Sequence, residues 1–235
     1  MLYKKGIIGS ETKPLFLFVG RFSPEKGLDV LADFAKDIII NKNGQVVIMG
    51  ALSGYIPLEL FELKSLENDK KNYNGLIKVY TSYEKNQLEI LEDIEATKGK
   101  VIRFASDFTI VPSVIEASGL VPVEGLSMGS ATISSYKEGL KDQCTNPYGN
   151  MHNIFTFTCI PFTRVMGNSA LSAKNLIDSL NQPLHEWNML SNKEKKQHQV
   201  FLIENAKTFD WNAKGGALDQ YIDLYIRTIE LANSD

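Results

Sequence analysis

Short runs of β-branched and aromatic residues alternate with helix-length segments along the first two thirds of this chain. The runs are LFLFVG (15–20), QVVIMG (45–50), LIKVYTS (76–82), FTIVPS (108–113), ATISS (131–135) and NIFTFT (153–158). Strands that are separated by helices run parallel, and a parallel sheet is covered by helices on both of its faces. The alternation therefore predicts an α/β fold with a doubly wound parallel sheet.

Helical periodicity connects the predicted strands and continues to the end of the chain. Apolar residues recur at helical spacing from Gly27 to Ile40, and the polar stretch NKNG ends that helix. The charged segment 83–104 predicts one helix and a turn at Gly99, and the chain reads as helical from Ser169 onward. We expect a leader at 1–13, a sheet domain at 14–168 and a helical extension at 169–235 that packs on the same domain.

Composition excludes several classes of function. The net charge is -3, with 25 Lys and Arg against 28 Asp and Glu, so a broad field for nucleic acid is not expected. The start of the chain lacks an apolar signal region, and no window reaches the roughly 18 apolar residues of a membrane span. Cys144 and Cys159 lack metal spacing. A disulfide between them is the alternative, but a sparse pair in a chain of this size fits a reducing compartment better, so we expect free thiols. We expect a soluble cytoplasmic protein.

The stretch GRFSPEKGLDVL, at residues 20–31, follows the first predicted strand. Gly20 allows the backbone to approach a ligand, while Arg21 and Lys26 lie on a loop that opens a helix. Two cations beside a helix N-terminus form a phosphate site, and ligands of doubly wound sheets bind beyond the carboxyl ends of the strands. The alternative is that Arg21 and Lys26 are solvated loop charges.

The stretch PSVIEASGLVPVEGLSMG, at residues 112–129, has the same placement after another strand. Glu116 lies in the loop and Glu124 lies on a helix that begins near Gly119. Carboxylates at this edge can accept hydrogen bonds from sugar hydroxyls, and free N–H groups at 118–120 can bind an anionic oxygen. Alternatively, Glu116 flanks a helix and Glu124 is a salt-bridge partner. Together with the two cations, the acids indicate a nucleotide-sugar pocket.

Several coordinated motifs resemble retaining glycosyltransferases with two Rossmann-like domains (GT-B fold), such as glycogen and starch synthases. LFLFVGRFSPEKGLDVLADFA is similar to their GR-x(4)-KG-x-D-x-L segment, and PSVIEASGLVPVEGLSMGSATI is similar to their E-x(7)-E motif. FASDFTIVPS and AKTFDWNAKGGALDQYIDLY resemble two further family segments. The resemblance runs from about Pro14 to Tyr225 and implies a Rossmann-like domain, one half of a GT-B fold, with a helical C-terminal tail.

The resemblance implies roles for individual residues. Arg21 and Lys26 would neutralise the donor diphosphate as the glycosyl bond breaks, and Glu116 would contact the transferred sugar. The remaining binding residues would be Gly20, Tyr83, Ser118, Gly119, Leu120 and Glu124. Of these, Tyr83 would lie by the base unless it is a core residue at the end of a strand, the backbone of 118–120 would cradle sugar and phosphate oxygens, and Glu124 would bind the ribose. No cofactor and no obligatory metal are implied.

Departures from the family pattern leave the substrates open. IEASGL replaces FEPCGL, and YKEGLKD replaces TGGL-x-DT. The donor would be a nucleotide sugar such as ADP-glucose, UDP-glucose or GDP-mannose, and the acceptor would be a glucan or another hydroxyl compound, protein included. A broader hexosyl- or mannosyltransferase is the alternative. The resemblance covers only the donor-binding domain, so we expect the acceptor and a catalytic histidine to come from an N-terminal domain outside this chain. His152, His185 and His198 read as solvated or capping residues.

Two other enzyme classes are disfavoured, and one non-enzyme alternative stays open. No G-x-G-x-x-G follows the first strand, as a Rossmann oxidoreductase would require, and no cluster has the ligand spacing of a metal hydrolase. An interaction module that keeps the fold without catalysis is the alternative. The helix that begins at about Asn212 would pack on the N-terminal domain, and its apolar residues would be partly exposed here: Leu218, Tyr221, Ile222 and Tyr225.

Overall fold

A six-stranded parallel sheet forms the centre of the protein, seen here in a computed structural model. The structure describes residues 2–52, 54–81, 98–117, 119–143, 159–210, 212, 214 and 216–232. The strands are β1 (Leu15–Phe22), β2 (Gln45–Leu52), β3 (Ile77–Thr81), β4 (Phe108–Val111), β5 (Ala131–Ser134) and β6 (Cys159–Pro161). Their order is β3-β2-β1-β4-β5-β6, and every neighbouring pair is parallel. The predicted doubly wound sheet is confirmed.

Five of the six predicted strands coincide with β1 to β5 to within two residues at either end. The sixth prediction, at 153–158, lies outside the described residues. β4 ends at Val111, before Pro112, because proline has no N–H group to donate to a neighbouring strand. Periodicity and β-branched composition therefore located the sheet well.

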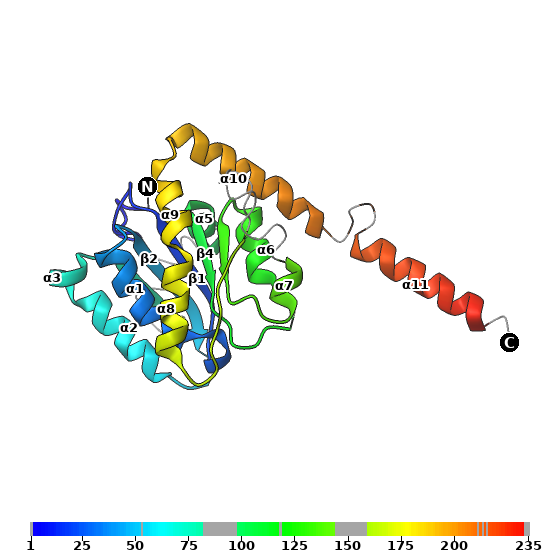
Figure 1. Cartoon of the computed structure of the whole chain (residues 1–235), viewed down its shortest axis with the longest axis horizontal. Helices are drawn as coiled ribbons and strands as arrows, with labels where there is room; N and C mark the ends of the chain where they lie inside the picture. Colours follow the sequence, from blue (N-terminus) through cyan, green and yellow to red (C-terminus); the bar gives the residue numbers. More distant parts are fainter. Residues whose placement is uncertain are drawn as a thin grey trace.

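Helices cover both faces of this sheet (Figure 1). One face carries α1 (Leu31–Ile40), α2 (Leu58–Asn68), α8 (Ser169–Ser179) and α9 (Asn181–Met189). The other carries α5 (Lys98–Ala105) and α6 (Leu120–Ser127), and α10 (Asn192–Ala206) packs against α6. Shorter elements are α3 (Lys70–Tyr73), α7 (Gly139–Gln143), η1 (Pro24–Lys26), η2 (Leu28–Val30) and η4 (Lys207–Phe209). The last helix is α11 (Ala217–Ala232).

Two predicted helix boundaries differ from the structure, and both involve glycine. The helix predicted from Gly27 begins at Leu31, because Gly27 has a φ of 77° and separates the short turns η1 and η2. The turn predicted at Gly99 was wrong, since α5 runs through this position. Ile102 of α5 packs into a buried cluster with Leu15 and Leu17 of β1. Packing of this kind outweighs the weak helix propensity of one glycine.

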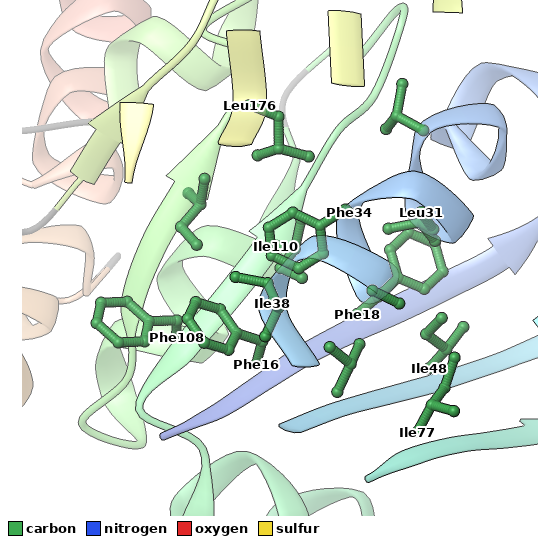
Figure 2. Close-up of a cluster of buried hydrophobic side chains, with 14 of the residues drawn as sticks. Phe16, Phe18, Leu31, Phe34, Ile38, Ile48, Ile77, Phe108, Ile110 and Leu176 are labelled. Carbon is green, nitrogen blue, oxygen red and sulfur yellow. The ribbon is translucent and has the colours of Figure 1, made fainter. Parts of the chain in front are cut away.

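Aromatic rings hold β1 and β4 together at the centre of the core (Figure 2). The register pairs Phe16 with Phe108, and their rings stack with centroids 4.9 Å apart. Phe34 of α1 meets Phe16 edge-on at 5.6 Å, and Trp187 of α9 meets Phe108 edge-on at 5.4 Å. Offset and edge-on pairs of this kind add to the stabilisation from burial alone. The stack therefore joins the two central strands to helices from both ends of the chain.

The helices after β6 fall into two groups. Leu176 of α8, Leu184 of α9 and Leu202 of α10 are buried in the same core cluster as the sheet. In contrast, α11 extends away from the rest of the molecule (Figure 1), and its described side chains from 218 to 231 are all exposed. Within the described part of the chain, no helix is both long enough and apolar enough to cross a membrane.

Two side-chain predictions were wrong. Cys159 is disulfide-bonded rather than a free thiol, and Cys144 lies outside the described residues. Sequence spacing does not reveal the distance between Cα atoms, which decides whether a disulfide can form.

His198 is fully buried and lies against the rings of Trp187 and Phe201 rather than in solvent. His185 is exposed, as predicted, and His152 lies outside the described residues.

The aromatic stack predicts that Phe16→Ala destabilises the fold by about 3 to 5 kcal/mol, because it leaves a cavity between β1, β4 and α1. Urea denaturation followed by circular dichroism measures this free energy of unfolding. The matched control is Phe61→Ala on the exposed side of α2, for which we expect a change within about 0.5 kcal/mol. Equal effects of the two substitutions would contradict the stated role of the stack.

Asp107 predicts a pH dependence of stability. Its carboxylate accepts a hydrogen bond from the Leu15 N–H at 2.8 Å, but burial raises its pKa to about 6. This pKa lies above the pKa of the same carboxyl in the unfolded chain, so the folded state binds the proton more tightly. The stabilisation of the folded state by this proton is therefore lost as the pH rises from 4 through 6.

We therefore expect the free energy of unfolding of the unmodified protein to fall as the pH rises from 4 through 6. This fall should be larger than the fall in Asp107→Asn by about 1 to 3 kcal/mol. Urea denaturation of both proteins at pH 4, 5, 6 and 7 measures the difference. Parallel pH profiles would show that burial does not perturb this carboxyl.

Candidate functional site

The candidate site lies where the chain connections diverge at the carboxyl ends of β1 and β4. These strands are neighbours, yet β1 is followed by β2 on one side and β4 by β5 on the other. Such a switch point leaves a crevice between the two following loops, which is where doubly wound sheets bind ligands. Both motifs singled out from the sequence follow these two strands.

The loop after β1 touches the backbone of the loop after β4. A Cβ atom added at Gly27 would lie 2.0 Å from the Pro112 carbonyl oxygen, so no other residue fits there without movement. The Val114 N–H donates to the Glu25 carbonyl at 2.8 Å and fastens the same two loops. The glycine therefore permits a close contact between backbones, in addition to its left-handed φ of 77°.

This contact places Lys26 against Glu116. The Lys26 ammonium lies 2.5 Å from Glu116 Oε2, and the side chains are only 20% and 15% exposed. The Ser113 hydroxyl donates to the same oxygen at 3.2 Å. A Cβ at Gly119 would lie 2.8 Å from Glu116 Cγ, so this glycine makes room for the carboxylate. The pair is therefore held in one geometry, although its partners are 90 positions apart in the sequence.

Arg21 lies at the same edge but is more open to solvent. Its side chain is 64% exposed, and its Nη2 lies 3.4 Å from Glu25 Oε1. Interactions of the carboxylate with the Ser23 hydroxyl and with the N–H of Glu25 itself lower the pKa of Glu25, and the charges of Arg21 and Lys26 contribute further. Exposed pairs of this kind contribute little to stability, so Arg21 is free to exchange Glu25 for another anion at small cost.

The other predicted residues are distributed around this centre. Gly20 lies inside β1, where its carbonyl oxygen would be 2.3 Å from a Cβ added at Gly50. Leu120 is the exposed first residue of α6, and Gly119 is its N-cap with a φ of 59°. The carboxylate of Glu124 pairs with Arg103 of α5, as in the alternative that makes Glu124 a salt-bridge partner. Tyr83 and Ser118 lie outside the described residues.

Sequence reasoning missed the contribution of the loop after β5. The Glu116 N–H donates to Glu138 Oε2 at 3.4 Å, and the Gly139 N–H donates to the Glu116 carbonyl at 3.3 Å. Tyr136 and Glu138 have φ values of 53° and 37°, which are uncommon for residues other than glycine. Ser113, the other missed residue, lies within the quoted PS motif, which was the available signal. Nothing in the spacing of Glu138 predicted its contact.

The arrangement combines cations for an anionic group with oxygens for hydroxyl groups. Lys26 and Arg21 supply positive charge at the switch point, while Glu116 supplies a half-buried acceptor beside the N-terminus of α6. The free N–H groups of a helix N-terminus add hydrogen-bond donors for an anion. Among the described residues, no group of three His, Cys, Asp or Glu side chains is arranged to hold a metal ion.

Comparisons with known proteins point to one family. A glycogen synthase of Geobacter sulfurreducens is 28% identical over 228 residues, which are 95% of this chain and 38% of that protein. A glycogen synthase of Lacticaseibacillus casei is 30% identical over 131 residues, 56% of this chain and 24% of that protein. The chain thus spans well under half the length of these relatives.

A solved structure shares the fold. The catalytic domain of starch synthase IV from Arabidopsis thaliana, bound to ADP and acarbose, superposes with a TM-score of 0.65 at 18% identity, covering 97% of this chain and 41% of that one. The family model described as "Glycosyl transferases group 1" matches residues 4–154, which is more than half of the chain. This protein therefore belongs to the group 1 family of glycosyl transferases, as a domain similar to the C-terminal GT-B domain of glycogen and starch synthases.

Proposed function

We propose that this chain is the donor-binding domain of a retaining hexosyltransferase, which binds a nucleoside diphosphate sugar at the carboxyl ends of β1 and β4. The observation that carries the proposal is the Lys26–Glu116 pair, held at the switch point by Gly27 and Gly119. It puts a cation for a diphosphate beside an oxygen for a sugar hydroxyl. The family membership and the similarity to glycogen synthases support this assignment.

In the proposed reaction the bond between the anomeric carbon and the diphosphate oxygen breaks, and an acceptor hydroxyl forms a new bond to the same face of that carbon. The bonding electrons leave with the diphosphate, whose charge grows in the transition state. Arg21 and Lys26 stabilise this charge, and Glu116 holds the hexose through its hydroxyls. The acceptor proton leaves through the diphosphate or a base outside this chain.

The carboxylates that pair with Lys26 and Arg21 would compete with the diphosphate of the ligand for these two cations. Lys26 is neutralised by Glu116, and Arg21 is neutralised by Glu25. A diphosphate would replace Glu25 at Arg21 and share Lys26 with Glu116. Since Arg21 and Glu25 are largely solvated, the exchange costs little, and the charge-assisted bonds to phosphate are stronger than the pair they replace.

We propose that a second domain supplies the acceptor, a glucan or another hydroxyl compound. The apolar residues of α11 would bind that domain. Leu218, Tyr221, Ile222 and Tyr225 are 43% to 67% exposed on a helix that no other described element covers. An exposed apolar face of this extent marks an interaction site. The helix would thus link the donor-binding domain to its partner domain.

Calorimetric titration with ADP-glucose, UDP-glucose and GDP-mannose tests the proposed function. We expect one donor to bind, and Arg21→Ala to weaken that binding about tenfold or more, because a charged contact to phosphate is lost. Arg227→Ala, an exposed arginine on α11, is the matched control and should leave the affinity unchanged. Failure of all three donors to bind would favour an interaction module with this fold.

A second titration separates the roles of the diphosphate and the sugar. If Glu116 holds the hexose, Glu116→Gln should weaken binding of the preferred donor about tenfold relative to the corresponding nucleoside diphosphate without sugar. The diphosphate alone should bind the variant at least as well as the unmodified chain, since a negative charge beside Lys26 is removed. An equal loss for both ligands would assign Glu116 to the phosphate site or to folding only.

A further inference from the structure

A second pocket lies between the carboxyl ends of β5 and β6, beyond the candidate donor site. It has a volume of about 380 Å³ and is lined by Tyr136, Lys137, Lys141, Thr163 and Arg164, among others. Arg21, Lys26 and Glu116 do not line it. Its size falls within the range of pockets for small molecules.

The lining of this pocket is strongly cationic. It includes Lys137, Lys141 and Arg164, and no Asp or Glu is found among the described residues that line it. Neither lysine forms an ion pair with any described residue. The nearby carboxylate of Glu138 accepts a hydrogen bond from the Glu116 N–H instead. The charges of the two lysines are therefore uncompensated among the described ion pairs, whereas Arg164 is paired with Asp29.

Arg164 is the buried member of this group. It is only 6% exposed, and its Nη2 donates to Asp29 of η2 at 2.5 Å. Its Nη1 is also buried but has no hydrogen-bond partner among the described residues. An unsatisfied buried donor of this kind is unfavourable, more so when the group is charged. Because Arg164 lines the pocket, its guanidinium charge also favours an anion there.

The loop that forms one wall is held in an uncommon backbone conformation. Tyr136 lines the pocket with a φ of 53°, and Glu138 has a φ of 37°. Such conformations are unfavourable and cluster at ligand-binding positions, where the surrounding structure maintains them. The Ser135 hydroxyl donates to the Ser113 carbonyl at 2.7 Å, which ties this loop to the one after β4.

We infer that this pocket binds the phosphate group of a phosphorylated ligand, with Lys137, Lys141 and Arg164 as its cationic contacts. A phosphate dianion offers three acceptor oxygens to the two ammonium groups, and the guanidinium of Arg164 adds positive charge at the wall of the pocket. The remaining volume can hold a sugar that carries the phosphate, with Pro161 and Phe162 as apolar contacts. This inference goes beyond the proposed donor site and does not depend on it.

Calorimetric titration at low ionic strength with inorganic phosphate, glucose 6-phosphate and glucose tests the inference. We expect both phosphates to bind and glucose not to bind. Lys141→Gln should weaken phosphate binding about tenfold. Lys141 is exposed on α7 and has no ion pair, so its replacement preserves the fold, whereas replacement of Arg164 would leave Asp29 unpaired. Tighter binding of glucose 6-phosphate identifies a phosphorylated sugar, and equal binding identifies free phosphate.

Two control variants separate this pocket from other cationic surfaces. Lys174→Gln, an exposed lysine on α8 that pairs with Asp178, should leave phosphate binding unchanged. Phosphate that binds at the donor site instead would be lost in Arg21→Ala rather than in Lys141→Gln. Loss of phosphate binding in Arg21→Ala but not in Lys141→Gln would overturn the inference, as would absence of phosphate binding up to about 10 mM.

Discussion

The close approach of the loop after β1 to the loop after β4 is the constraint on which the candidate site depends. Gly27 lies against the Pro112 carbonyl at a distance that excludes any side chain, and Val114 is hydrogen-bonded to Glu25 across the same junction. Without this contact, Lys26 and Glu116 would be separate loop charges. With it, they form a half-buried pair at the switch point of the sheet.

The core places the loops after β1 and β4 at the same edge of the sheet. Stacking of Phe16 on Phe108 pairs β1 and β4 in register, so the carboxyl ends of both parallel strands lie at the same edge of the sheet. Trp187 and Phe34 close the stack from α9 and α1, so a helix from late in the chain supports a junction formed by early strands. The helices after β6 are thus part of the scaffold that positions the site, with the exception of the exposed α11.

The loop after β5 connects the donor site to the second pocket. On one side, Glu138 and Gly139 hydrogen-bond to the backbone of Glu116. On the other, Tyr136 and Lys137 line the cationic pocket beside Arg164. Because Arg164 also pairs with Asp29 in η2, residues from three separate connections meet around this loop. The two sites therefore share the loop after β5.

The sequence by itself determined the class of fold, the strands β1 to β5 and the start of α6, because period-two and period-3.6 patterns and turn residues are local signals. It also singled out Arg21, Lys26, Glu116 and Gly119 as members of coordinated motifs. Only the tertiary structure decided that Lys26 pairs with Glu116, that Glu124 pairs with Arg103, and that His198 is buried. These outcomes depend on contacts between residues far apart in the chain, which neither periodicity nor spacing encodes. The unpartnered nitrogen of Arg164 is another outcome that only the tertiary structure decided, because a missing hydrogen bond can be recognised only when the positions of all neighbouring groups are known.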